Sequence, residues 1–136
     1  MIDVNIRAPY YASVEAARNM PANGRIIVIG SVNGDRVPFP GGSAYAMTKS
    51  ALLGMVRGLA RDFGSRGITV NLVQPGPTNT DMNPADGPMS GLMHGVMAIG
   101  RHATADEVAG LVSYLASPDA AIVTGAVHTI DGGFAA

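Results

Sequence analysis

The apolar residues of this chain follow two kinds of spacing, one helical and one continuous. Residues 6–20 have helical spacing, with Pro9 in the first turn, where an N–H group has no helical partner to lose. Residues 25–30 (RIIVIG) and 68–73 (ITVNLV) are short unbroken runs rich in β-branched side chains. Such runs are typical of strands buried on both faces of a parallel sheet. These segments therefore predict one helix and two buried strands.

The longest helical pattern covers residues 43–63. It follows a Gly- and Pro-rich loop at 31–42, and Ser43 is its predicted N-cap. Its apolar side chains recur at the spacing of one helix face. That spacing predicts a core stripe consisting of Leu52, Met55, Val56, Leu59, Ala60 and Phe63.

The last part of the chain adds a loop, a helix and a strand. Residues 74–95 are rich in Pro, Gly and Met and are only weakly patterned. Thr104 and Glu107 then have the spacing of a capping box, which predicts the start of a helix. Ser117 precedes the proline that ends this helix, and residues 121–131 predict the last strand.

Helices and strands thus alternate along the chain, which is typical of an α/β fold with a parallel sheet between two layers of helices. We expect about three parallel strands with flanking helices. In such sheets, ligands bind beyond the carboxyl ends of the strands. Those ends are Ser31, residues 74–80 and Asp131, so we expect the functional site there.

Composition excludes several functions. The 136 residues suffice for one domain, and a net charge of −1 with 5% aromatic residues argues against a nucleic-acid-binding surface. The absence of cysteine excludes thiolate chemistry. The histidines lack the spacing of a metal site, so we expect no metal at His94, His102 and His128. No signal peptide or membrane-spanning run is visible, and we expect a cytoplasmic protein that does not bind membranes.

Tyr45 and Lys49 are four positions apart at the start of the 43–63 helix, so they lie on one helix face. A tyrosine phenol holds its proton too tightly for acid–base catalysis near neutral pH, and a neighbouring ammonium stabilises the phenolate. The pair therefore has the spacing that a catalytic tyrosine needs. Taken alone, such a pair is more often the amphipathic edge of a packed helix.

Longer motifs around this pair resemble the short-chain dehydrogenase/reductase family. They are RIIVIGS at 25–31, YAMTK at 45–49, GITVNLVQPGPTNTDM at 67–82 and TGAVHTIDGGF at 124–134. The resemblance covers essentially the whole chain. It implies the C-terminal half of a Rossmann-like doubly wound parallel sheet, and an NAD(P)-dependent oxidoreductase that reduces carbonyls or oxidises alcohols of small molecules. Whether the cofactor is NAD or NADP stays open.

The resemblance also assigns roles to single residues. Tyr45 and Lys49 match the catalytic pair, and Ser31 matches the serine that polarises the substrate carbonyl. Asn5 matches an asparagine that holds a water in a proton relay. The residues implied in cofactor binding, on its nicotinamide side, are Tyr45, Lys49, Pro75, Gly76, Thr78 and Thr80.

Structural alternatives stand beside these roles. Ser31 can simply terminate a strand, and Asn5 is equally well placed to be a helix N-cap. Thr80 can start an ordered loop. Asn71, in the middle of a predicted strand, is expected to be a buried structural residue with satisfied hydrogen bonds.

The family's Gly-rich first half has no counterpart in this sequence. Residues 1–136 are therefore expected to form a single, incomplete Rossmann-like domain without the adenosine and pyrophosphate site, possessing the catalytic half only. The missing neighbour would leave strand 25–30 at an exposed edge of the sheet. Residues 82–100 are the expected substrate loop or lid, and its flexible apolar side chains are Met82, Met89, Met93 and Met97.

Two other functions remain open. The sequence is most similar to a bacterial branch described as cyclic-di-GMP-binding biofilm-dispersal proteins, for which Arg36 and Arg101 are the candidate ligand contacts. A non-catalytic remnant of an active parent is the third alternative. The family resemblance also implies a homo-dimer or homo-tetramer through helices 6–20 and 43–63. A small-residue face at Ala51, Gly54 and Gly58 fits that contact or packing within the chain.

Overall fold

Three parallel strands form the centre of the fold. The computed structural model describes residues 1–136. Its strands β1 (Arg25–Ile29), β2 (Thr69–Pro75) and β3 (Val127–Ile130) lie side by side in the order β1-β2-β3. Arg25 lies opposite Thr69, and Leu72 lies opposite Val127. Residues 69–74 of the central strand are all buried, as the unbroken apolar run predicts.

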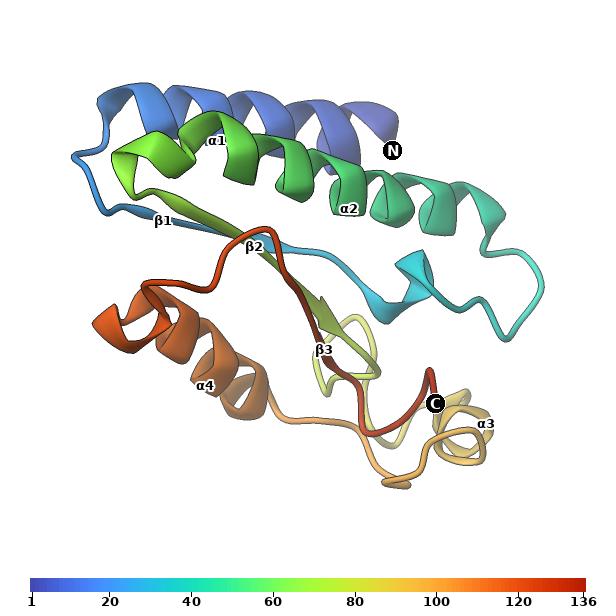
Figure 1. Cartoon of the computed structure of the whole chain (residues 1–136). Coiled ribbons are helices and arrows are strands. Elements are labelled where there is room, and N and C mark those ends of the chain that lie inside the picture. The colour runs from blue at the N-terminus through green and yellow to red at the C-terminus, as the bar shows by residue number, and fades with distance from the viewer.

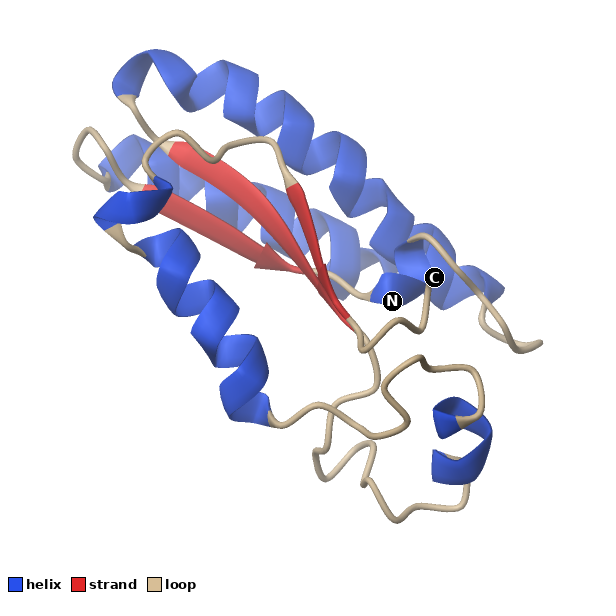
Figure 2. Ribbon diagram, turned by 60° about the horizontal axis from the view of Figure 1, so that its bottom comes forward, coloured by secondary structure: helices blue, strands red, loops and turns tan.

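Helices cover both faces of this sheet. A π-helical turn (Asp3–Arg7) continues into α1 (Ala8–Asn19), which lies beside α2 (Ser43–Phe63) on one face (Figures 1 and 2). The helix α4 (Ala105–Ala116) covers the other face. The main core between α1, α2 and the sheet consists of Ala17, Ile26, Val28, Leu52, Val56, Leu59, Ala60, Ile68, Val70 and Leu72. This arrangement confirms the Rossmann-like α/β fold.

Local sequence signals placed the ends of two helices correctly, whereas the helix predicted at 6–20 begins earlier, with the π-helical turn at Asp3, and ends at Asn19. The predicted helix 43–63 is confirmed residue for residue, and Met55 and Phe63 are partly buried against the main core. The capping box is confirmed because Glu107 N donates to Thr104 Oγ1 and Thr104 N donates to the Glu107 carboxylate. The helix it starts packs on the second face of the sheet, where Val73 and Leu115 are fully buried.

Three local expectations were wrong. Ser43 is not an N-cap, because Ala46 N already donates to the Gly42 carbonyl and makes Gly42 the capping position. The last strand is only Val127–Ile130, since a turn at residues 121–122 and a bend at Gly125 occupy the residues before it. The weakly patterned segment 74–95 is not all loop, because β2 extends through Pro75 and a short helix, α3, spans Ser90–His94.

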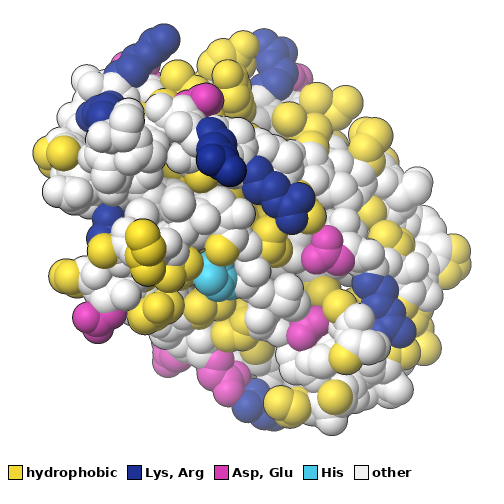
Figure 3. Space-filling model, in the orientation of Figure 1, with side chains coloured by type: hydrophobic (Ala, Val, Ile, Leu, Met, Phe, Trp, Pro, Cys, Tyr) yellow, Lys and Arg dark blue, Asp and Glu magenta, His cyan; other side chains and the backbone are white.

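The outer edge of β1 has no neighbouring strand. Ile29 is 48% exposed there. A groove of about 320 Å³ runs between this strand and the N-terminal helix, and its lining includes Asn5, Ser13, Ile27 and Lys49. No helix of the chain is both long and apolar enough to cross a bilayer. Acidic and basic side chains are dispersed over the face seen in Figure 3.

Candidate active site

A pocket of about 220 Å³ lies beyond the carboxyl ends of the strands. Ser31, two residues after the end of β1, lines this pocket. Tyr45 lines it from the first turn of α2. Pro75 and Gly76 reach it from the end of β2. The parallel topology therefore brings four of the predicted site residues into one pocket, as expected for a sheet of this kind.

The Ser31 hydroxyl is oriented by its own turn. Its Oγ accepts a hydrogen bond from Asn33 N at 3.2 Å, which starts the 3-10 turn Val32–Gly34. No protein acceptor takes the hydroxyl hydrogen. Ser31 thus caps the turn that follows the strand, and its hydroxyl can still donate a hydrogen bond to a ligand in the pocket.

Lys49 lies one helical turn after Tyr45, close to its ring. Its Nζ is 5.6 Å from the centroid of the Tyr45 ring and 3.4 Å from the Ile29 carbonyl oxygen. Burial of the ammonium lowers the pKa of Lys49 from its ordinary value of 10.5. A positive charge at this position stabilises negative charge on the neighbouring phenol.

Asn5 is not a helix N-cap. It lies inside the helical turn Asp3–Arg7, and its Nδ2 donates to Thr48 Oγ1 at 3.0 Å. Thr48 Oγ1 donates in turn to the Tyr45 carbonyl at 2.7 Å. Asn5 and Lys49 line the groove along β1, whereas Ser31 and Tyr45 line the pocket beyond the strands. Asn5 is therefore tied to α2 through Thr48, in the groove that Lys49 also lines.

The remaining predicted cofactor residues lie outside the pocket lining. Thr78 Oγ1 donates to the Gly76 carbonyl at 3.0 Å, which braces the turn after β2. Thr80 is exposed, and its hydroxyl accepts from Asn83 N at 3.2 Å, so it does start an ordered turn. Asn71 is fully buried, with its carboxamide bonded to Val123 O and Ala126 N, which confirms its structural role.

Several site residues escaped sequence reasoning. Phe39 and Phe134 line the pocket from two loops and Met93 lines it from α3, and no spacing in the sequence connects them. Of the four methionines expected in the lid, only Met93 lines the pocket. Gln74 directly precedes Pro75-Gly76, is fully buried and has no protein partner for either amide atom. It precedes the pocket residues Pro75 and Gly76 but does not line the pocket itself.

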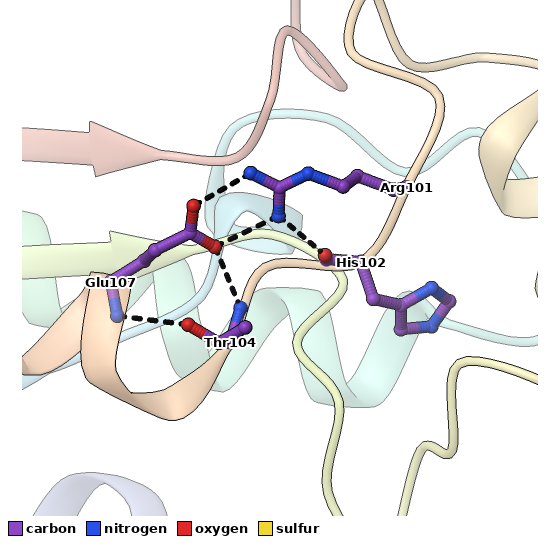
Figure 4. A network of polar contacts seen from close by, with 4 residues as sticks. All are labelled: Arg101, His102, Thr104 and Glu107. Atoms are coloured by element: carbon purple, nitrogen blue, oxygen red, sulfur yellow. Dashed lines mark hydrogen bonds and ion pairs between the residues drawn. The ribbon is translucent and has the colours of Figure 1, made fainter.

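The two arginines considered for cyclic-di-GMP are engaged by the protein itself. Arg101 donates two hydrogen bonds to the Glu107 carboxylate, of 2.6 and 2.9 Å, and a third to the His102 carbonyl. The His102 imidazole points away from Arg101 and Glu107 (Figure 4). The bonds from Arg101 to the carboxylate, with that from Thr104 N, lower the pKa of Glu107 to about 2. Arg36 Nη1 donates to the carbonyls of Phe134 and Ala136.

Known proteins match almost the whole of this chain. The family described as enoyl-(acyl carrier protein) reductase matches residues 1–135. The cyclic-di-GMP-binding biofilm dispersal mediator protein of Escherichia coli K12 is 65% identical over 136 residues, which are 100% of this chain and 57% of that protein.

Two solved structures have the same fold. The crystal structure of BdcA in complex with NADPH has a TM-score of 0.96 and 65% identity, covering 98% of this chain and 55% of that one. A short-chain dehydrogenase/reductase from Serratia marcescens has a TM-score of 0.98 and 55% identity, covering 100% of this chain and 56% of that one. The chain thus spans slightly more than half the length of these relatives. By its family match, its identity with these proteins and its fold, the chain belongs to the short-chain dehydrogenase/reductase family.

Proposed function

We propose that the protein containing this chain is an NAD(P)-dependent oxidoreductase that interconverts carbonyls and alcohols of small molecules. One observation carries the proposal: Ser31 and Tyr45, two hydroxyl groups distant in the sequence, line one pocket together with Pro75 and Gly76. Because the chain spans little more than half of its relatives, the activity is proposed for the full-length protein.

Each of four side chains has its own role in the proposed carbonyl reduction. Tyr45 donates its phenolic proton to the carbonyl oxygen while a hydride adds to the carbonyl carbon, so that C=O becomes CH–OH. Ser31 donates a hydrogen bond to the same oxygen, where negative charge develops. Lys49 stabilises the phenolate that Tyr45 leaves behind. Asn5, in the groove that Lys49 also lines, supports a water relay that returns the proton. In the oxidative direction each proton moves the opposite way.

The residues present fit a nicotinamide cofactor. Gly76 packs so closely on the chain that a Cβ there would come within 2.6 Å of Asp131 Cα, so a side chain at this position would displace the turn that lines the pocket. Tyr45, Pro75 and Gly76 are proposed to hold the nicotinamide, with Lys49, Thr78 and Thr80 on its ribose and amide side. When bound, the cofactor supplies the hydride. The NADPH complex of BdcA supports NADP as the first cofactor to test.

The test is the Tyr45→Phe variant of the full-length protein. We expect NADPH-dependent carbonyl reduction to fall at least about 100-fold while NADPH binding is retained, because only the transferable proton is lost. Tyr114→Phe is the matched control, since Tyr114 lies exposed on α4. Undiminished turnover by Tyr45→Phe would overturn the proposal. NADPH binding without turnover in the parent protein would instead favour the non-catalytic remnant.

A second candidate function is cyclic-di-GMP binding, which the name of the Escherichia coli relative favours. Arg36 and Arg101 are engaged, so we assign the phosphates to Arg57 and Arg61. Neither makes a hydrogen bond or ion pair with its side chain, and both line a cavity of about 680 Å³ together with Ser65. Calorimetry should detect binding that the double change Arg57→Gln and Arg61→Gln abolishes and Arg36→Gln does not. No heat at micromolar protein counts against this candidate.

We also propose that the chain is one part of a larger Rossmann-like domain, with residues 82–100 as its substrate lid. The open edge of β1, its half-exposed Ile29 and the groove beside it support a further parallel strand at that edge. We expect residues 1–136 alone to associate with increasing concentration, whereas the full-length protein stays dispersed, as light scattering would measure. Equal behaviour of the two would contradict this proposal.

A homo-dimer or homo-tetramer through α1 and α2 is proposed on the surface of these helices. A methyl group added at Gly54 or Gly58 would meet nothing within 4 Å, so these glycines do not serve packing within the chain. They line an open cavity of about 230 Å³ with Ile6 and Tyr10. Gly54→Glu should shift the full-length protein to a smaller species in sedimentation.

The cytoplasmic location stays a prediction.

A further inference from the structure

The wall of the Ser31–Tyr45 pocket contains no charged side chain. Its polar groups are the two hydroxyls and the neutral carboxamides of Asn33 and Asn83. The rest of its lining is apolar or backbone, with Phe39, Met93 and Phe134 as the largest side chains. A charged substituent bound here would lose hydration without gaining a counter-ion among the lining side chains, which is costly in free energy.

The apolar wall is already ordered before any ligand arrives. Phe134 is 4% exposed and packs in a small cluster with Val32 and Met97. Its ring meets that of Phe39 edge to face, with centroids 6.4 Å apart. Arg36 bonds its carbonyl, and the Asp131 carboxylate accepts from Gly133 N at 2.9 Å and Ala135 N at 2.8 Å. A fixed wall binds a matching group without the entropy cost of ordering side chains.

The pocket is also small. At about 220 Å³ it lies below the roughly 300–1,000 Å³ typical of sites for drug-sized ligands. In the proposed function, part of this space is taken by the nicotinamide. The group that fits against this part of the wall is therefore compact.

We propose that the site selects an uncharged, compact aldehyde or ketone whose aryl or short alkyl group packs against Phe39, Met93 and Phe134. This inference rests on the proposed function and adds the substrate class. An aryl group gains most, because aromatic rings and the methionine thioether favour edge and face contacts with it. Carboxylate-bearing carbonyls and the phosphate-bearing arm of acyl thioesters find no counter-charge in this wall, despite the acyl-carrier name of the matching family.

Benzamide and benzoate form a matched pair of probes, since they share one shape and differ in charge. We expect calorimetry on the full-length protein, with and without NADPH, to show benzamide binding about tenfold or more tightly than benzoate. The same preference is expected in turnover, with acetophenone and benzaldehyde favoured over pyruvate and acetoacetyl-CoA. Equal or tighter binding of benzoate, or no binding of benzamide, overturns the substrate class.

Variants locate the effect in the wall. Phe134→Leu keeps an apolar side chain in the cluster, and Met93→Ala shortens a lining side chain. Each should raise KM for acetophenone about tenfold, because the aryl group loses part of the surface it packs against. Met89→Ala is the control, because Met89 is in the same segment but does not line the pocket. An unchanged KM in both wall variants overturns the assignment. Benzamide binding without turnover of any carbonyl would contradict the proposed oxidoreductase function. It would still support the preference of the pocket for uncharged ligands.

Discussion

Asn5 and Thr48 lie 43 positions apart in the sequence and share a hydrogen bond of 3.0 Å from Asn5 Nδ2 to Thr48 Oγ1. Thr48 is 1% exposed, and its hydroxyl in turn donates a hydrogen bond to the Tyr45 carbonyl. One buried hydroxyl therefore joins the N-terminal helical turn to the first turn of α2, where the candidate catalytic tyrosine lies.

Replacing Thr48 should destabilise the protein in a way that depends on the hydroxyl. Thr48→Val keeps the shape of the side chain but leaves the Asn5 amide without its acceptor. We expect it to lower the free energy of unfolding by about 1–3 kcal/mol. Thr48→Ser retains the hydroxyl and should lose clearly less. Urea unfolding measures both, and equal losses in the two variants would show that the hydrogen bond is unimportant.

Lys49 should titrate below the ordinary lysine range, and the sequence makes this easy to measure. It is the only lysine of the chain, so a single ε-amine signal reports it after isotopic labelling. Burial lowers its pKa from 10.5, so the folded protein releases this proton at a lower pH than the unfolded chain. Stability should therefore rise as pH increases through the lowered pKa toward 10.5.

The Lys49→Met variant checks the sign of this effect. It removes the ammonium and keeps an unbranched stem, so we expect a higher Tm than the parent at pH 7. The difference should shrink as the pH approaches 10.5, where the folded parent has lost the charge. A difference that stays constant from pH 7 to 10.5 would contradict the assigned cause.

Gln74 and Asn71 are two buried carboxamides on β2 with opposite hydrogen-bonding status. Gln74 has no protein partner for either amide atom, whereas Asn71 bonds Val123 O and Ala126 N. We expect Gln74→Met to raise the free energy of unfolding by about 1 kcal/mol or more, because it removes unpaired buried groups. Asn71→Leu should lower it by about 2 kcal/mol or more, since it creates such groups. Chemical denaturation of both variants in parallel tests the contrast, and a loss of stability in Gln74→Met would refute it.

Acid should weaken the attachment of α4 through Glu107. Its pKa falls from 4.5 to about 2, first because of the hydrogen bond from Arg101 and then because of that from Thr104 N. The contribution of Glu107 is therefore complete above about pH 4.5 and is lost as the pH falls to about 2. Solvent screens this exposed pair, so the effect is expected to be small and to diminish in salt.

Calorimetric scans from pH 2 to 7 test this window. The Tm values of the parent and Glu107→Gln should coincide near pH 2 and separate as the pH rises above it. Asp106→Asn is the control, because Asp106 lies in the same first turn and makes no side-chain hydrogen bond. A Tm difference between parent and Glu107→Gln that does not vary with pH would contradict the prediction.

The predictable parts of this structure were those with a local cause. The apolar stripe of α2 and the capping box of α4 depend on neighbours within a few positions, and both were found. The Ser43 cap failed because Ser and Gly are both good capping residues, and only the backbone path of the preceding loop decides between Gly42 and Ser43.

The candidate site divides in the same way. Ser31, Tyr45 and Pro75 lie at the ends of regular elements, and the rule that parallel strands end at one edge was sufficient to bring them together. Phe39 and Phe134 lie in loops whose path is determined by contacts between distant segments. Their meeting depends on packing that no spacing in the sequence encodes.

The parallel register also has a kinetic consequence. Arg25 pairs with Thr69 and Leu72 pairs with Val127, so each pairing closes a loop of about 45 to 55 residues. The entropy of loop closure must be overcome before such contacts stabilise the chain, whereas a helix such as α2 forms within microseconds. We therefore expect helices to precede the sheet during refolding, with a delay in which bare strand edges can meet other chains. In a cell, the length of that delay, rather than the final stability, would decide how much of the newly made chain reaches its native state.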